Sequence, residues 1–357
     1  MRSAALAKPH ALEEPPVSET TDEIRVLRSR WWGRAGIVVV LGALVGVAVV
    51  TAFRFSSALQ EIRFSTVTLA GLSGLLTLLL AVVIVVGAAW ARAFGTRYAV
   101  WWALAAMIPL VLVIQYAFPT ITGLVAPDDP GRGRRVTILA QNMFWESSRT
   151  EDQIDELLQQ HADVYVLSEF TPKALEALRQ HGLDRRFPYT VLRPDPGRLG
   201  MAVLSRFPLL VRSAGTYRIE VNLVPPGAAP LHVIAAHTPA PTRAGIHGWQ
   251  SDLDALARVA KQAGPNTVVA GDLNATSGHV AFREMASRAE LTDAQDAAGG
   301  GFAGTWNLMS RLPPLLRFDH VLVGSGVGVD DFRFAPRIGS DHQGVIATIV
   351  ARSATST

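Results

Sequence analysis

The polar residues that could carry out chemistry in this 357-residue chain gather at the ends of short apolar runs. They are carboxylates, carboxamides and imidazoles, and the chain contains no cysteine. Oxygen donors without sulfur suit a hard cation such as Mg²⁺ or Mn²⁺, and a histidine beside an aspartate can hold an imidazolium in place. The candidates are Asn142, Glu169, His237, Asp272, Asn274, Asp319, Asp341 and His342. Together they indicate metal-assisted hydrolysis of a phosphoester by water attack.

The residue types suggest how the work could be divided. Glu169 and Asp341 could supply negative charge to a cation, with Asn142 as a neutral ligand or phosphate contact. In the run Gly-Asp-Leu-Asn, Asp272 could accept a proton from water while Asn274 donates to the reacting oxygen. Each motif alone is more often a turn, a cap or a rim charge. The prediction therefore rests on their ordered combination.

Short apolar runs, which we expect to be buried strands, position these residues. The runs cover residues 136–142, 164–170, 200–206, 231–236, 267–271, 318–323 and 344–350. Amphipathic patterns between them predict helices at 151–161, 172–181, 247–262 and 280–289. Because strands and helices are mixed in this way, we expect a layered α/β domain over residues 136–352, large enough for a sizeable core.

The N-terminal third contains three charge-free stretches, each long enough for the roughly 20 apolar residues that cross a bilayer. Within residues 34–118, the predicted transmembrane helices are 35–53, 66–91 and 98–118. Three buried helices of a soluble domain are a poor alternative, because such runs leave no solvated face. The flanking segments are a disordered tail at 1–33, a linker at 119–135 and a C-terminal tail at 353–357.

Charge is divided unevenly along the chain. Residues 1–135 hold 13 basic and 8 acidic residues, whereas residues 136–357 hold 20 basic and 22 acidic residues. The near-neutral C-terminal part makes nucleic acid a less expected partner than the lipid bilayer, because a duplex-DNA binder must neutralise many phosphates. Basic residues flanking the first span favour a cytoplasmic N-terminus. Three spans then predict a multi-pass protein of the plasma membrane with its C-terminal domain outside the cytoplasm.

Over residues 136–352 the ordered motifs resemble those of the endonuclease/exonuclease/phosphatase superfamily. The resemblance rests on Gln141-Asn142, Leu167-Ser168-Glu169, the run from Gly200 to Arg206, Ala236-His237-Thr238, Gly271-Asp272-Leu273-Asn274, Phe318-Asp319-His320 and Ser340-Asp341-His342. It implies a four-layer α/β sandwich of the DNase I type, with two mixed sheets flanked by helices. It also implies hydrolysis of phosphoester bonds with Mg²⁺, Mn²⁺ or a similar ion.

The resemblance implies a metal site with three contributors. Glu169 resembles the principal metal ligand, Asn142 the asparagine beside metal and phosphate, and Asp341 a further metal-site carboxylate. Some nuclease members carry a second carboxylate two residues after the asparagine. Here Phe144 stands at that position, so this departure puts a second metal site in doubt and leaves one or two metals open.

The other candidates resemble the catalytic residues of the family. Asp272 and Asn274 resemble the pair that aligns the attacking water and binds the phosphate. His342 resembles the histidine that contacts the scissile phosphate, with Asp319 as its carboxylate partner. His237 resembles a phosphate-binding histidine that follows a central strand.

Three function classes stay open on the sequence. The leading hypothesis is a membrane-anchored, metal-dependent phosphohydrolase, because tethering raises the effective concentration of an enzyme over a lipid substrate. Three spans ahead of such a domain resemble a bacterial subgroup that includes proteins linked to teicoplanin resistance, which implies a phosphorylated lipid or cell-envelope substrate. The alternatives are an extracytoplasmic tethered nuclease with a basic groove, and an inactive binding or sensor module.

Overall fold

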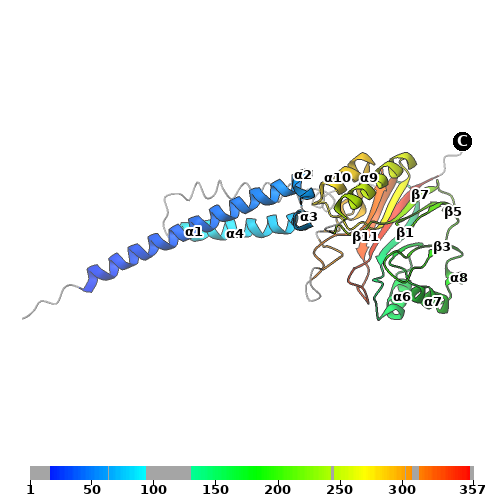
Figure 1. Cartoon of the computed structure of the whole chain (residues 1–357), viewed down its shortest axis with the longest axis horizontal. Coiled ribbons are helices and arrows are strands. Elements are labelled where there is room, and N and C mark those ends of the chain that lie inside the picture. The colour runs from blue at the N-terminus through cyan, green and yellow to red at the C-terminus, as the bar shows by residue number, and fades with distance from the viewer. Residues whose placement is uncertain are drawn as a thin grey trace, which may run out of the picture. The chain divides into compact units, whose positions relative to one another are not determined.

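The computed structural model describes residues 17–62, 64–93, 130–242, 245–301, 303–307 and 313–353 (Figure 1). The chain divides into two compact units. Within the described residues, the first unit comprises residues 17–47 and 79–93, and the second comprises residues 48–78 and the chain from residue 130 onward. All the predicted site residues lie in the second unit.

The first unit is built from the greater part of two long apolar helices, α1 (Val17–Phe55) and α4 (Ser73–Ala93). They pack closely, since a Cβ atom on Gly87 would lie only 2.6 Å from the Val40 side chain. Small residues let helix backbones approach in this way in membrane helix pairs. Two stretches are long and apolar enough to cross a membrane, Arg34–Phe55 and Ser73–Trp90.

Helix α1 begins earlier than the sequence predicted. We expected a disordered tail over residues 1–33, but α1 starts at Val17, directly after Pro15-Pro16 in the sequence. No proline occurs between Val17 and Phe55, and no glycine occurs between Val17 and Gly33, so the tail region continues directly into the apolar helix. Residues 1–16 lie outside the described part of the chain.

The predicted second span, residues 66–91, is divided in two. Residues Phe64–Gly71 form a separate short helix, α3, and α4 begins only after Leu72. Helix α3 belongs to the second unit, where Val67 is 2 % exposed and packs in the same apolar cluster as Trp249. The start of this apolar stretch therefore packs on the α/β unit.

The other N-terminal predictions meet the structure only in part. The predicted first span, 35–53, lies inside the apolar stretch of α1. The predicted third span, 98–118, lies outside the described residues, as does the linker up to residue 129. The last three linker residues, Gly133–Arg135, belong to the first strand of the domain, because their backbone pairs with the last strand.

The second unit contains two six-stranded sheets, each with a parallel pair of strands at its centre and antiparallel neighbours outside it. In order, the first sheet comprises β11 (Val327–Phe334), β12 (Val345–Arg352), β1 (Gly133–Asn142), β2 (Val164–Ser168), β4 (Met201–Ser205) and β3 (Tyr189–Arg193). The second comprises β5 (Leu209–Ala214), β6 (Arg218–Leu223), β7 (Leu231–His237), β8 (Thr267–Asp272), β10 (Asp319–Gly324) and β9 (Leu291–Asp293). The parallel pairs are β1 with β2 and β7 with β8.

Helices cover both outer faces of the packed sheets, which makes the four-layer α/β sandwich that the sequence predicted (Figure 1). On β1, alternation sends Ile138 and Ala140 into the core between the sheets and Leu139 into the core beneath the helices. The first sheet is covered by α6 (Thr150–Gln159) and α7 (Pro172–Gln180), and the second by α9 (Ile246–Ala263) and α10 (Val280–Arg288).

The predicted strands and helices of this domain are all present, with ends within three residues of the prediction. Five strands were not predicted, namely β3, β5, β6, β9 and β11. Three short helices were also missed, α2 (Ser57–Glu61), α8 (Leu183–Arg186) and α11 (Ala294–Ala297).

Candidate active site

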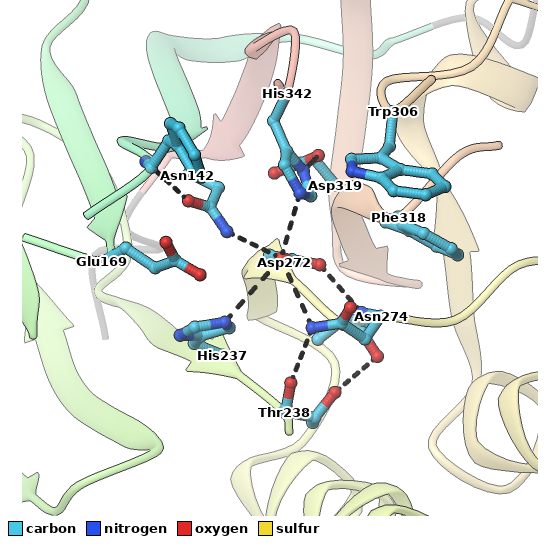
Figure 2. Close-up of polar contacts among 12 residues, drawn as sticks. Asn142, Glu169, His237, Thr238, Asp272, Asn274, Trp306, Phe318, Asp319 and His342 are labelled. Carbon is cyan, nitrogen blue, oxygen red and sulfur yellow. Dashed lines mark hydrogen bonds and ion pairs between the residues drawn. The ribbon is translucent and has the colours of Figure 1, made fainter. Parts of the chain in front are cut away.

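The parallel strand pairs bring the candidate residues together. Asn142 ends β1, Glu169 follows β2, His237 ends β7 and Asp272 ends β8. Asp319 opens β10, where it pairs directly with Asp272. The two strands of a parallel pair end at the same edge of the sheet, where open sheets gather ligands. A hydrogen bond of 2.9 Å from Asn142 Nδ2 to Asp272 Oδ2 joins the edges of the two sheets (Figure 2).

Asp272 is the centre of the group and is 1 % exposed. Its Oδ1 accepts a hydrogen bond of 2.8 Å from the backbone N–H of Asn274. Its Oδ2 accepts from Asn142, and the Nε2 atoms of His237 and His342 each lie 3.8 Å from that oxygen. One buried carboxylate is thus surrounded by two amides and two imidazoles (Figure 2).

His342 forms a close pair with Asp319, with 2.7 Å between His342 Nδ1 and Asp319 Oδ2. The backbone N–H of Asp319 donates to Thr305 Oγ1, which fixes the start of β10. Two buried polar atoms here have no hydrogen-bond partner among the described residues, Asp319 Oδ1 and His237 Nδ1. Such unpartnered atoms are rare in buried regions, which makes this place a candidate functional site.

Electrostatics separate the protonation states of these residues. Burial opposes charge on His342, but the carboxylates of Asp319, Asp272 and Asp341 outweigh it and raise the pKa of His342 to about 10. The imidazole is therefore charged at neutral pH and donates Nδ1–H to Asp319. Burial raises the pKa of Asp272, against the opposing effect of His342. A carboxylate with a raised pKa is a stronger proton acceptor.

Three residues of the site region have a positive φ, which side chains other than glycine rarely adopt. The angle is 53° at Glu169, 45° at Asn274 and 55° at Phe144. Glu169 Oε2 accepts a hydrogen bond of 2.9 Å from the backbone N–H of Trp145. Figure 2 shows the Glu169 carboxylate pointing toward the centre of the group. Backbone strain of this kind clusters at functional sites.

Gly271 allows β7 and β8 to approach each other beside the site. Its φ is 134°, and a Cβ atom there would lie 2.1 Å from the carbonyl oxygen of Ala236. Any other residue would clash with the backbone of β7. In the run Gly-Asp-Leu-Asn, the glycine is therefore required by the close packing of β7 and β8.

The structure adds an aromatic wall that the sequence reasoning missed. Trp306 Nε1–H donates a hydrogen bond of 3.0 Å to Asp341 Oδ2. Its ring centre lies 5.5 Å from that of Phe318, which lies 6.5 Å from that of His342 (Figure 2). The position of Phe318 next to Asp319 was an available signal. Trp306 stands in no motif and is recognisable only from its contacts.

One compact group of possible metal ligands among the described residues is Asp272, Asp319 and His342, whose ligand atoms all lie within 4.8 Å of one another. Of the predicted metal ligands, the carboxylates of Glu169 and Asp341 are not part of this group, and Asn142 contacts it through its hydrogen bond to Asp272. Because His342 Nδ1 is engaged by Asp319, the compact group has the form of an Asp–His pair facing a second carboxylate.

A model of the Endonuclease/Exonuclease/phosphatase family matches residues 139–342, more than half of the chain. The chain belongs to the endonuclease/exonuclease/phosphatase family. The matched range begins within β1 and ends at His342, so it contains every predicted site residue. A comparison with curated proteins found no match.

Solved structures are similar to this family member at low sequence identity. Truncated TDP2 of Caenorhabditis elegans is 19 % identical over 61 % of this chain and 98 % of its own, with a TM-score of 0.46. A family protein from Bacteroides thetaiotaomicron is 14 % identical over 62 % and 99 %, with a TM-score of 0.47. Sphingomyelinase C of Streptomyces griseocarneus is 19 % identical over 60 % and 99 %, with a TM-score of 0.43.

Enzymes of this family generally depend on a divalent metal, and the residues present fit one. The Glu169 carboxylate accepts one hydrogen bond, from the Trp145 N–H, and its other lone pairs remain available to a cation. Asn142 Oδ1 accepts from the Phe144 N–H and has a second lone pair. Oxygen donors without sulfur suit Mg²⁺ or Mn²⁺.

Proposed function

We propose that this chain is a membrane-anchored, divalent-metal-dependent phosphohydrolase that cleaves a phosphoester or pyrophosphate of a lipid or cell-envelope substrate by attack of water. One observation carries the proposal: a buried carboxylate, Asp272, lies between two asparagines and two histidines at the joined edges of the sheets. These groups can bind a phosphate, orient a water and take up its proton.

The Asp272–Asn274 pair prepares the attacking water. Asp272 has a raised pKa because it is buried, so it can take the proton that the water loses. Asn274 is held by its backbone N–H on Asp272 Oδ1 and by its side-chain Nδ2 on the Thr238 carbonyl at 2.9 Å. Its Nδ2 also donates to Asp272 Oδ2 at 3.4 Å, so the carboxamide oxygen is the atom placed to accept a hydrogen bond from water.

The Asp319–His342 pair stabilises the charge that develops on the phosphate. Asp319 fixes Nδ1–H of His342 at 2.7 Å, which leaves the opposite nitrogen, Nε2, on the side of Asp272. A charged imidazole in this orientation donates to a phosphate oxygen. His237, whose Nε2 lies on the other side of Asp272, is placed to bind a second phosphate oxygen.

Glu169 and Asn142 would hold the divalent metal, with Asp341 as a further carboxylate. When bound, such an ion polarises the phosphoryl oxygens and neutralises part of their charge. Glu169 is kept in place by the Trp145 N–H, and Asn142 by Asp272 and the Phe144 N–H. Phe144 stands where a second carboxylate would be needed, which supports a single metal.

Membrane anchoring is supported by the two apolar stretches of α1 and α4. The segment between them, residues 56–72, contacts the catalytic domain, since Thr276 Oγ1 donates to the Gly71 carbonyl at 3.3 Å. If both stretches cross the bilayer, the catalytic domain lies on the side of this segment. The basic residues before the first stretch favour a cytoplasmic N-terminus, which places that side outside the cytoplasm. The predicted third span, 98–118, would return the chain to that side.

The decisive experiment is a substrate panel on the full chain purified in detergent, with Mg²⁺ or Mn²⁺ added after chelation. The panel contrasts polyprenyl pyrophosphate, phospholipids, nucleotides and duplex DNA. We expect metal-dependent release of phosphate or head group from a lipid substrate. Hydrolysis of DNA alone would favour the tethered nuclease, and no turnover of any phosphoester would contradict the enzyme.

A separate experiment tests the orientation. A reporter enzyme that works only outside the cytoplasm, fused after Thr357, should be active.

A further inference from the structure

A second buried polar cluster ties residues 54–71 to the loop between β8 and α10. Gln60 is 3 % exposed, and its Oε1 accepts a hydrogen bond of 3.0 Å from the Val280 N–H. Its Nε2 donates to the Gly278 carbonyl at 3.3 Å and to the Phe53 carbonyl at 2.7 Å. One glutamine therefore links the end of α1 to the catalytic domain. We call this cluster the joint; its residues are Arg54, Gln60, Val67, Ala70, Gly71, Thr276, Gly278, His279, Val280 and Arg283.

In the joint, a side chain of the catalytic domain caps the C-terminal end of α1. Arg283 Nη2 donates to the Arg54 carbonyl at 2.6 Å, and its Nη1 donates to the Gly278 carbonyl at 2.9 Å. The guanidinium also lies 5.4 Å from the centre of the Phe55 ring. Carbonyl groups at a helix end lack helical partners, and a cation there also matches the helix dipole.

The same loop caps α3. His279 Nδ1 accepts from the Thr276 N–H at 2.9 Å, so its Nε2 carries the proton and donates to the Val67 carbonyl at 3.1 Å. Burial lowers the pKa of His279 to about 4, which keeps the imidazole neutral. The backbones also touch, because a Cβ atom on Gly278 would lie 2.0 Å from the Ala70 carbonyl oxygen. This close packing leaves no space for a residue larger than glycine at position 278.

The joint lies beside the active site but does not hold it. Asn274 and Thr276 are two residues apart, so their Cα atoms are at most about 7 Å apart. The intervening backbone is fixed by other parts of the catalytic domain: the Leu273 carbonyl accepts from Trp249 Nε1 at 3.2 Å, and the Ala275 carbonyl lies 2.9 Å from His320 Nε2. Loss of the joint should therefore leave Asp272 and Asn274 in place.

We propose that the joint selects membrane-held substrates: it fixes the catalytic domain against the segment that enters the bilayer, so that a phosphoester at the membrane surface meets the active site. This inference rests on the proposed function. A domain on a loose tether would sample many orientations, whereas a fixed one keeps the site aligned with the surface. A soluble phosphoester diffuses to the site in any orientation and does not need the joint.

The test compares one head group in two physical states, using the full chain reconstituted in phosphatidylcholine vesicles with Mg²⁺. The first pair is long-chain polyprenyl pyrophosphate in the vesicles against soluble geranyl pyrophosphate. The second is dioleoyl phosphatidylglycerol in the vesicles against monomeric dihexanoyl phosphatidylglycerol. The joint variants are Gly278→Ala and Gln60→Ala. Their matched controls are Gly248→Ala, where a Cβ meets nothing within 4 Å, and Gln180→Ala on the exposed end of α7.

We expect both joint variants to lose about tenfold in the ratio of vesicle to soluble rate, with the soluble rate unchanged. The controls should keep the wild-type ratio. In Gln60→Ala, hydrogen exchange at the Val280 amide should rise, because its acceptor is gone. An unchanged ratio, parallel loss of both rates or unchanged exchange would overturn the role of the joint. The wild type is also assayed with bis(4-nitrophenyl) phosphate, a soluble diester. Hydrolysis of this diester but of neither lipid pair would overturn the role of the joint. Wild-type protein without any turnover would overturn the proposed function instead.

Discussion

Two buried polar clusters flank the loop after β8, and they differ in how completely their groups are paired. In the active site, Asp319 Oδ1 and His237 Nδ1 have no partner among the described residues. In the joint, Gln60 uses both ends of its carboxamide and His279 uses both ring nitrogens. Buried polar groups are normally satisfied, so the joint is what a stable fold requires and the active site is the exception.

The histidines of the two clusters show the same contrast in their charge. Three carboxylates overcome the effect of burial and raise the pKa of His342 to about 10, whereas burial lowers the pKa of His279 to about 4. Both residues are 6 % exposed or less. Neighbouring charges, and not burial, therefore decide which histidine is ready for chemistry. The candidate active site combines unpaired buried atoms with several charged groups, as functional sites do, whereas the joint pairs its polar groups around a neutral histidine.

The largest expected effect is a loss of kcat, and it should distinguish the His342–Asp319 pair of the site from the His320–Asp293 pair. His320 Nδ1 lies 2.7 Å from Asp293 Oδ2, the same distance as in the His342–Asp319 pair. His342→Gln should lower kcat by about 10³-fold with little change in Tm, because a neutral amide cannot stabilise the developing phosphate charge. His320→Gln should lower Tm and leave kcat per folded molecule near the wild-type value. Equal losses of kcat in the two variants would break the distinction.

The neutral histidine of the joint should make the fold sensitive to acid. The ordinary pKa of histidine, about 6.5, is lowered to about 4 in the fold. Between these values the unfolded chain binds a proton that the folded chain does not. The contribution of His279 to the free energy of unfolding is therefore full above about pH 6.5 and falls by up to about 3 kcal/mol as the pH drops to about 4.

Denaturant unfolding of the full chain at pH 7, 5 and 4 measures this loss of stability. The control is His279→Asn, whose Oδ1 can still accept from the Thr276 N–H but does not titrate. The difference in free energy of unfolding between the wild type and His279→Asn should shrink or reverse as the pH falls. A constant difference would mean that His279 does not set the acid sensitivity of the joint.

Metal dependence provides the third comparison. Glu169→Gln keeps the size of the side chain and the acceptor for the Trp145 N–H, but removes the charge. We expect the Mg²⁺ concentration for half-maximal hydrolysis to rise by about 100-fold, with excess Mg²⁺ restoring part of the rate. Chelation should abolish activity in the wild type. The joint variant Gln60→Ala should keep the wild-type Mg²⁺ requirement, and a matching shift there would show that the two clusters are not independent.

Much of this organisation could be predicted from the sequence, and the missed strands show where prediction stopped. The central strands are unbroken apolar runs because both of their faces are covered. Four of the five missed strands, β3, β5, β9 and β11, are the edges of the two sheets, where polar residues are allowed. The fifth, β6, alternates between buried and half-buried residues in a way that could have been recognised.

The site and the joint differed in predictability for a physical reason. The site residues lie at the ends of strands, so one local pattern repeated along the chain was enough to identify them. The joint depends on a contact between Gln60 and Gly278, which lie 218 residues apart, and neither belongs to a motif. The same holds for Trp306, whose role becomes visible only in its hydrogen bond to Asp341. Long-range pairing of single residues leaves no periodic signal in the sequence.

The smallest expected effect concerns Asp341. Its role as a metal ligand is a prediction from the sequence, and its hydrogen bond in the structure is to Trp306. One of its oxygens accepts from Trp306 Nε1, and an asparagine keeps an oxygen acceptor at that position. Asp341→Asn should therefore raise the Mg²⁺ requirement by only about tenfold, less than Glu169→Gln, and leave the indole in place. Mg²⁺ titrations of the rate compare the two variants, with the change in tryptophan fluorescence between Trp306→Phe and wild type as the structural reference. A shift as large as that of Glu169→Gln would make Asp341 an equal ligand, and no shift would remove it from the metal site.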